Sequence, residues 1–330
     1  MSHNIHQQMK LSDILMLVGL SILWGGSFFF VEILVKHLPP FTIVTCRVGF
    51  AALALWAIVL ALKIPLPKTR QDWTALFIVG FLNNALPFSL IVWGQTQISS
   101  GLASIFNATT PFFTVLVAGA LLIDERITKP KLLGVLVGFL GVIVLIGPEA
   151  LKGMTGSMLG QLAVMGAAIS YAFAGAFSRR FKRWGLSPLI VATGQVTMAT
   201  LMLFPLMMII DKPQFSMTLP LEAIGAIIGL AFFSTVIAYI LYFRLIASAG
   251  ATNAALVTFL IPISAILLGV TFLGEAFTVR LQRVLKPSHR PLGSLQLYRH
   301  HQLTRDDGPL CALLVSPKRP LGHSQCGPAH

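Results

Sequence analysis

One stretch decides the fold class: residues 14–35 read ILMLVGLSILWGGSFFFVEILV and contain a single charged residue, Glu32. The hydrocarbon core of a bilayer, about 30 Å thick, takes roughly 20 apolar residues in a helix, so this run is long enough to cross it. It is too long for a signal peptide, and no small-residue cleavage site separates it from the next segment. We therefore expect an uncleaved first transmembrane helix.

The rest of the chain repeats this pattern. Of its 330 residues, 55% are hydrophobic and 11% are charged, whereas about 25% of the residues in a soluble domain are charged. In lipid, a helix is the open-ended structure that satisfies its own backbone hydrogen bonds. The sequence predicts an all-α integral membrane protein of about nine transmembrane helices, at 12–35, 41–62, 73–97, 100–123, 131–148, 157–178, 188–210, 221–246 and 251–274.

The net charge of +13 comes from basic residues between the apolar runs and from a basic tail. With the N-terminus in the cytoplasm, the cytoplasmic loops would carry 12 Lys and Arg residues and the external loops three, as the positive-inside rule requires. We expect a multi-pass protein of the cell (inner) membrane with a cytoplasmic N-terminus. Charge placed in this way indicates membrane topology, so a nucleic-acid partner is not expected.

The chain contains an internal repeat. Pro40 and Arg47 are seven residues apart at the start of the second apolar run, and so are Pro188 and Gln195 at the start of the seventh. Further matches follow in the same order: Gly80–Trp93 with Gly229–Tyr242, and Pro111–Glu125 with Pro262–Glu275. Because five helices in the first unit reverse the direction of the second, the repeat is inverted, as is typical of secondary transporters. We expect an N-terminal arm at 1–10, a first five-helix repeat at 11–148 and a second repeat, with four helices present, at 157–278.

Beyond Thr278 the pattern stops. Residues 279–330 hold eight basic and two acidic residues and have no helical period. This tail replaces the tenth helix of a 5+5 arrangement, and it would emerge on the outside, against the positive-inside rule. We expect a disordered segment or the product of a shifted reading frame or a truncated gene. A genuine basic extension is the alternative.

These features resemble the drug/metabolite transporter superfamily, in its EamA-like branch. The resemblance rests on short sequence motifs and single residues in the expected order: Leu23–Ser27, Arg47, Ser100–Ser104, Pro111, Asp124–Thr128, a Gly-rich fifth helix, Leu260–Pro262 and Leu273–Glu275. The resemblance covers about 11–278. It implies a permease that moves amino acids, metabolites, sugars or drugs, often outward.

Motifs for catalysis and for nucleotide binding do not occur in the sequence. There is no G-x-x-x-x-G-K-[ST] loop, no H-E-x-x-H and no metal or redox spacing among the eight His and three Cys residues. We therefore expect no enzyme activity, no cofactor and no metal, and a secondary transporter that exports small solutes by alternating access. An integral membrane enzyme and a non-functional truncated relic are the alternatives. The expected partners are a small-molecule solute and the lipid bilayer, and a homodimer remains open.

Charged residues within a membrane are costly and mark functional sites. Glu32 and Arg47 lie at comparable depths on consecutive helices and are predicted to form a charge pair. Two interpretations of that pair stay open: a site for a zwitterionic solute or a proton, and an ion pair near the interface.

Polar and aromatic residues supply the other candidates. Asn83 and Asn84 precede Pro87, which removes a backbone hydrogen bond and can open a kink beside them. For all candidates, simple packing or interhelical hydrogen bonding is the alternative. The predicted lining of a central cavity is Trp24, Ser27, Arg47, Asn83, Asn84, Tyr171, Gln195 and Tyr239.

Overall fold

The computed structural model describes residues 9–122, 128–146, 157–213 and 218–274. All regular secondary structure in these ranges is helical, and the elements labelled η are π-helical. The predicted tail at 279–330 lies outside the described residues. In chain order the elements are α1 (Leu11–Leu34), α2 (Pro40–Ala61), α3 (Arg70–Gly80), η1 (Phe81–Ala85), α4 (Leu86–Gln95), α5 (Ser100–Asn107), α6 (Thr110–Leu121), α7 (Lys129–Ile146), α9 (Met158–Arg183), α10 (Pro188–Leu206), η2 (Met207–Asp211), α11 (Leu221–Ile228), η3 (Gly229–Ile237), α12 (Ala238–Ala255) and α13 (Val257–Phe272).

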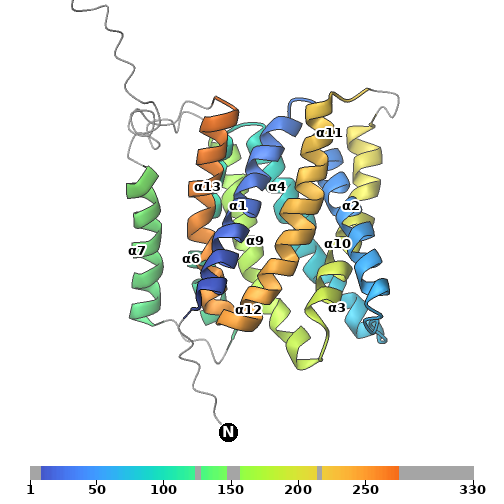
Figure 1. Ribbon diagram of the computed structural model, residues 1–330, viewed down its shortest axis with the longest axis vertical. Helices are drawn as coiled ribbons and strands as arrows, with labels where there is room; N and C mark the ends of the chain where they lie inside the picture. The colour runs from blue at the N-terminus through green and yellow to red at the C-terminus, as the bar shows by residue number, and fades with distance from the viewer. Residues whose placement is uncertain (1–8, 123–127, 147–156, 214–217, 275–330) are drawn as a thin grey trace, which may run out of the picture. The chain divides into compact units, whose positions relative to one another are not determined.

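Within the described ranges, these elements form eight helices that are long and apolar enough to cross a membrane (Figure 1). Several elements join into single spans: α3, η1 and α4 form Arg70–Gln95, and α5 and α6 form Ser100–Leu121. Eight of the predicted helices are therefore of membrane length. The fifth predicted helix is α7, whose 18 residues include a shorter apolar stretch, Leu132–Gly141.

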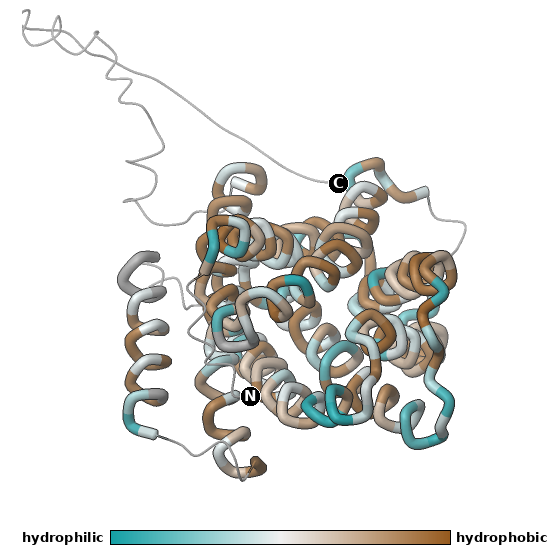
Figure 2. The backbone as a smooth tube through the Cα atoms, turned by 60° about the horizontal axis from the view of Figure 1, so that its bottom comes forward, coloured by the Kyte–Doolittle hydropathy of each residue, from teal (hydrophilic) through white to brown (hydrophobic). Residues whose placement is uncertain are grey.

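The outer surface of the helices is apolar. Leu11 is 72% exposed and Leu221 is 84% exposed, and many other large hydrophobic side chains are exposed between them in the sequence. Figure 2 shows hydrophobic residues along the helices and hydrophilic residues mainly toward their ends. In water such a surface would be an aggregation hazard. A lipid bilayer removes the hazard, which agrees with the all-α integral membrane fold.

Contacts between the two halves occur in matched pairs. The first helix of the first half, α1, packs against α13, and the first helix of the second half, α9, packs against α5 and α6. The third span of each half likewise packs against the first helix of the other: α4 against α9, and η3 and α12 against α1. The second helices, α2 and α10, pack against each other. A two-fold relation between the halves requires this pattern.

The second helices also resemble each other at both ends. Both begin at a proline, Pro40 or Pro188, and both are followed by a lysine in the left-handed conformation, Lys63 (φ 51°) or Lys212 (φ 47°). The lysine comes 23 positions after the proline in the first half and 24 in the second. A π-turn contains one residue more than an α-turn. The π-helical η2 therefore absorbs the extra residue and keeps the two helices matched.

Glycines allow two of the closest approaches between halves. A Cβ on Gly25 of α1 would overlap the Ser264 side chain and lie 2.8 Å from the backbone nitrogen of Ala265, both in α13. A Cβ on Gly80, where α3 meets η1, would lie 2.7 Å from the carbonyl oxygen of Gln195 in α10. Small residues let membrane helices come this close. The repeat-defining Gly80 thus brings α3 against α10 next to the candidate site.

Candidate functional site

Arg47 is buried in the second turn of α2, with 6% of its surface exposed. Its Nε donates a hydrogen bond to Oγ1 of Thr235 at 3.1 Å, and its guanidinium carbon lies 3.7 Å from the centre of the Phe88 ring. It also lies close enough to the phenols of Tyr171 and Tyr239 to interact with them electrostatically. A hydroxyl, a benzene ring and two phenols are all neutral at pH 7.

The π-helical η3 orients the hydroxyl that Arg47 contacts. Thr235 donates its own proton to the carbonyl of Leu230 at 2.9 Å, five residues back, as π-helical geometry permits. Its oxygen lone pairs are then free to accept from Arg47. The η3 turn of the second half therefore presents a hydroxyl acceptor to the buried cation of the first half.

The two asparagines of η1 bind side chains of the other half. Asn84 is completely buried, and its Nδ2 donates to the Tyr239 hydroxyl at 2.8 Å. Asn83 donates to Oε1 of Gln195 at 3.0 Å. Oδ1 of Asn84 has no hydrogen-bond partner in the described part of the chain. A buried acceptor left unpaired costs about 1–3 kcal/mol, so this oxygen is available to a ligand that carries a hydrogen-bond donor.

The repeat-related residues Arg47 and Gln195 make equivalent connections. Each lies seven positions after the proline that begins its helix. Arg47 reaches η3 in the second half through Thr235, and Gln195 reaches η1 in the first half through Asn83. We call the cluster of Arg47, Thr235, Asn83, Gln195, Asn84 and Tyr239 the polar centre. It lies at the interface between the two halves, which we call the seam, and both of its equivalent hydrogen bonds cross that interface.

Aromatic rings continue from this centre toward α1. The Trp24 ring lies 5.2 Å from that of Tyr242, centre to centre. The Phe243 ring lies 5.8 Å from Tyr242 and 6.2 Å from Tyr239. Tyr171 is half-buried and packs against both of the large hydrophobic clusters of the core. These rings form an apolar wall with several polar atoms.

The structure thus brings Arg47, Asn84, Tyr171 and Tyr239 together, places Asn83 and Gln195 beside them, and connects Trp24 through Tyr242. Ser27 is buried on α1, one helical turn from Trp24. The predicted pair of Glu32 with Arg47 stays a prediction, as does the role of each residue in binding.

Sequence reasoning missed Thr235, Phe88 and Tyr242 as members of this cluster. Tyr242 carried a signal, because it ends the repeated Gly229–Tyr242 phrase. Thr235 and Phe88 carried none: a threonine and a phenylalanine in an apolar run are ordinary helix residues, and only the three-dimensional packing places them against Arg47.

Comparison with known proteins identifies the family. The model of the EamA-like transporter family matches residues 11–147 and again 158–281. The chain belongs to this family. Each match covers one half of the symmetric contact pattern. The family comprises transporters and not enzymes, so the chain is a multi-pass membrane transporter.

Individual relatives are distant but align over most of their length. An uncharacterized transporter of Archaeoglobus fulgidus is 27% identical over 78% of this chain and 88% of its own length. A probable amino-acid metabolite efflux pump of Salmonella typhimurium is 26% identical over 78% of this chain and 85% of its own. The uncharacterized inner membrane transporter YedA of Escherichia coli is 26% identical over 79% and 83%.

A solved crystal structure has the same fold. It superposes with a TM-score of 0.61 at 20% sequence identity and covers 82% of this chain and 92% of its own. At this identity the likeness concerns the fold alone.

Proposed function

We propose that this chain is a secondary transporter that exports small metabolites by alternating access, with the polar centre around Arg47 as its solute site. The observation that carries the proposal is the buried guanidinium. A charged side chain deep in a membrane protein is costly, and the partners described for Arg47 are neutral. A carboxylate or another anionic group on the solute would form charge-assisted hydrogen bonds with the N–H groups of this guanidinium.

The polar centre offers complementary groups for the rest of a solute. Oδ1 of Asn84, which has no partner among the described residues, is an acceptor for a donor group of the solute. The hydroxyl of Tyr239 donates or accepts, and the rings of Tyr171 and Trp24 provide apolar contact. Small polar metabolites with an anionic group fit this set. The name of the Salmonella relative, an efflux pump, supports the outward direction.

The two ends of the α2–α10 pair differ, which supports an alternating mechanism. At one end, Asp211 accepts hydrogen bonds from the backbone nitrogen and the hydroxyl of Thr42 at 2.6 and 2.8 Å, and His37 contacts Glu222 at 3.0 Å. At the opposite end lie two cavities of about 360 and 260 Å³, one between α3 and α9 and one lined by residues 65–68, 72 and 185–187. The first end is closed by contacts between the halves, and the second is hollowed.

In the proposed cycle, the repeats at 11–148 and 157–278 rock against each other. The Thr42–Asp211 and His37–Glu222 contacts open as the other end of the α2–α10 pair closes. With the predicted orientation, that other end faces the cytoplasm, from which an exported solute enters. The hydrogen bonds of Arg47, Asn83 and Asn84 across the seam exchange for bonds to the solute when it binds.

The test is a metabolite profile of cells that express the full chain, compared with cells that express Arg47→Gln, Arg47→Lys or no chain. We expect at least one small anionic metabolite to accumulate outside cells that express the wild type. Arg47→Gln should abolish this accumulation. Arg47→Lys should reduce it, because lysine keeps the positive charge but lacks the planar guanidinium that donates two parallel hydrogen bonds. Exposed Lys182→Gln is the control with one positive charge removed elsewhere. An unchanged profile between wild-type and empty cells would refute transport.

A further inference from the structure

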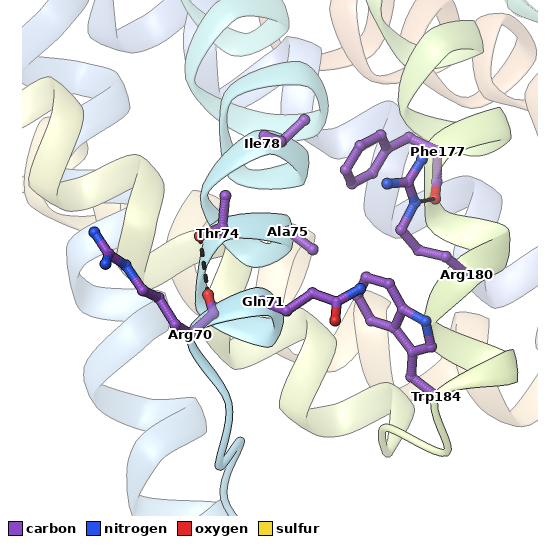
Figure 3. A pocket seen from close by; sticks show the side chains of 8 residues that line it. All are labelled: Arg70, Gln71, Thr74, Ala75, Ile78, Phe177, Arg180 and Trp184. Atoms are coloured by element: carbon purple, nitrogen blue, oxygen red, sulfur yellow. Dashed lines mark hydrogen bonds between the residues drawn. The ribbon is translucent and has the colours of Figure 1, made fainter.

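The larger cavity, between the start of α3 and the end of α9, has features that the transport proposal does not use. It has a volume of about 360 Å³ and is lined by eight residues: Arg70, Gln71, Thr74, Ala75, Ile78, Phe177, Arg180 and Trp184 (Figure 3). Ligand pockets typically range from about 300 to 1,000 Å³. Two of the eight are arginines and none is acidic, so the cavity favours an anion.

The lining changes from polar to apolar along the helices. Arg70, Gln71 and Trp184 lie at the helix ends, whereas Ile78 and Phe177 lie about two turns further in. Trp184 is 37% exposed, and tryptophan is enriched where membrane helices meet the headgroup region. A cavity with a cationic, amide-bearing rim and an apolar floor at this depth matches a molecule with an anionic head and an apolar tail.

Phe177 holds the Arg180 side chain in a position to meet an anionic headgroup. Its guanidinium carbon lies 3.5 Å from the centre of the Phe177 ring, and its Nε donates to the Phe177 carbonyl at 3.0 Å (Figure 3). Neither terminal nitrogen of Arg180 has a partner among the described residues. Gln71 extends toward Trp184 from the opposite wall, whereas Arg70 points away from α9 (Figure 3). Arg180 is therefore the cation that an anion in this cavity would meet.

We propose that this cavity binds the phosphate headgroup of an anionic phospholipid, with the Arg180 terminal nitrogens and the Gln71 amide on the phosphate and the acyl chains against Ile78 and Phe177. Basic pockets between helices at a membrane face recognise anionic lipid headgroups in this way. The surrounding charges favour the same ligand, because Arg179, Lys182 and Arg183 lie on the same end of α9.

The test uses the full chain in an uncharged detergent and phosphatidylglycerol with brominated acyl chains, which quenches nearby indole fluorescence. Subtracting the signal of Trp184→Phe isolates Trp184. We expect saturable quenching of Trp184 by brominated phosphatidylglycerol and little by brominated phosphatidylcholine. Arg180→Gln should raise the half-saturating concentration roughly tenfold, because it removes charge-assisted hydrogen bonds to the phosphate.

Arg183→Gln is the matched control, because it removes the same charge three residues away outside the cavity lining, and we expect a clearly smaller rise, fivefold at most. Arg180→Lys, which keeps the charge, should fall between wild type and Arg180→Gln. If Arg180→Gln does not stay monodisperse, Gln71→Leu should weaken quenching instead. Equal weakening by Arg180→Gln and Arg183→Gln, or equal quenching by both lipids, would overturn the proposal. Displacement of the lipid by glycerol phosphate alone would overturn the assignment to a lipid.

Discussion

Substitution of Gly25 by alanine tests a close approach between the two halves. The new Cβ would overlap the Ser264 side chain and lie 2.8 Å from the backbone nitrogen of Ala265. A side chain can turn away but a backbone atom cannot, so α1 and α13 must separate. Separation also weakens the hydrogen bond from Ser264 to the carbonyl of Ser21 at 2.6 Å.

The expected cost follows from these contacts. Overpacking costs about 1–3 kcal/mol, and an interhelical hydrogen bond in a membrane protein contributes about 0.6 kcal/mol on average. Gly26, the next residue, is the control, because its Cβ would meet nothing closer than 3.7 Å. Both variants gain about 1 kcal/mol of helix propensity. The difference in unfolding free energy between Gly25→Ala and Gly26→Ala is therefore free of that gain, and we expect about 1.5–3.5 kcal/mol.

The assay is unfolding of the purified chain in mixed micelles with increasing sodium dodecyl sulfate, followed by tryptophan fluorescence. The double variant Gly25→Ala with Ser264→Ala should recover only part of the loss, because the Ala265 nitrogen stays in the way. Equal stability of Gly25→Ala and Gly26→Ala would refute the close packing of α1 on α13. Full recovery in the double variant would show that the hydroxyl alone limits the approach.

Two further predictions concern hydrogen bonds across the seam, and the same unfolding assay measures both. Tyr239→Phe leaves the buried Asn84 amide unpaired and should lower the free energy of unfolding by about 1–3 kcal/mol. The double variant Tyr239→Phe with Asn84→Leu should lose less stability, because both partners become apolar. Equal losses in the two variants would contradict this reasoning. Asp211→Ala removes the carboxylate that satisfies the start of α2, where Pro39 offers no side-chain cap, and should cost about 1–2 kcal/mol. Asp211→Asn should cost less, and a neutral Asp211→Ala would show that the contact does not stabilise the closed end.

Much of this architecture was predictable because lipid imposes simple rules. Long apolar runs such as 14–35 had to be helices, and the spacing of Pro40 and Pro188 from Arg47 and Gln195 marked positions that the structure places in equivalent contacts. Burial of Arg47 beside the aromatic residues was also predictable in outline, since a charge in an apolar run must find partners within the protein.

The details of the site were less accessible. The kink expected at Pro87 takes the form of a π-helical turn at Phe81–Ala85, which no periodicity in the sequence marks. The stacking of Arg47 on Phe88 and its bond to Thr235 depend on how two distant helices cross. These contacts depend on the three-dimensional packing of the helices, which cannot be derived from a single sequence.

The third span of each half contains a π-helical segment, η1 or η3. Both turns lie at the matched glycines, Gly80 and Gly229, and both carry side chains that bond across the seam. An α-helix advances by about 100° per residue, so conversion of η1 to α-helix would swing the preceding turn of α3 around its axis by that angle. Asn83 and Asn84 would then leave Gln195 and Tyr239 while the rest of the span stayed helical. Under the proposed alternating-access cycle, such a conversion would release a solute by rotation of one segment without unwinding it.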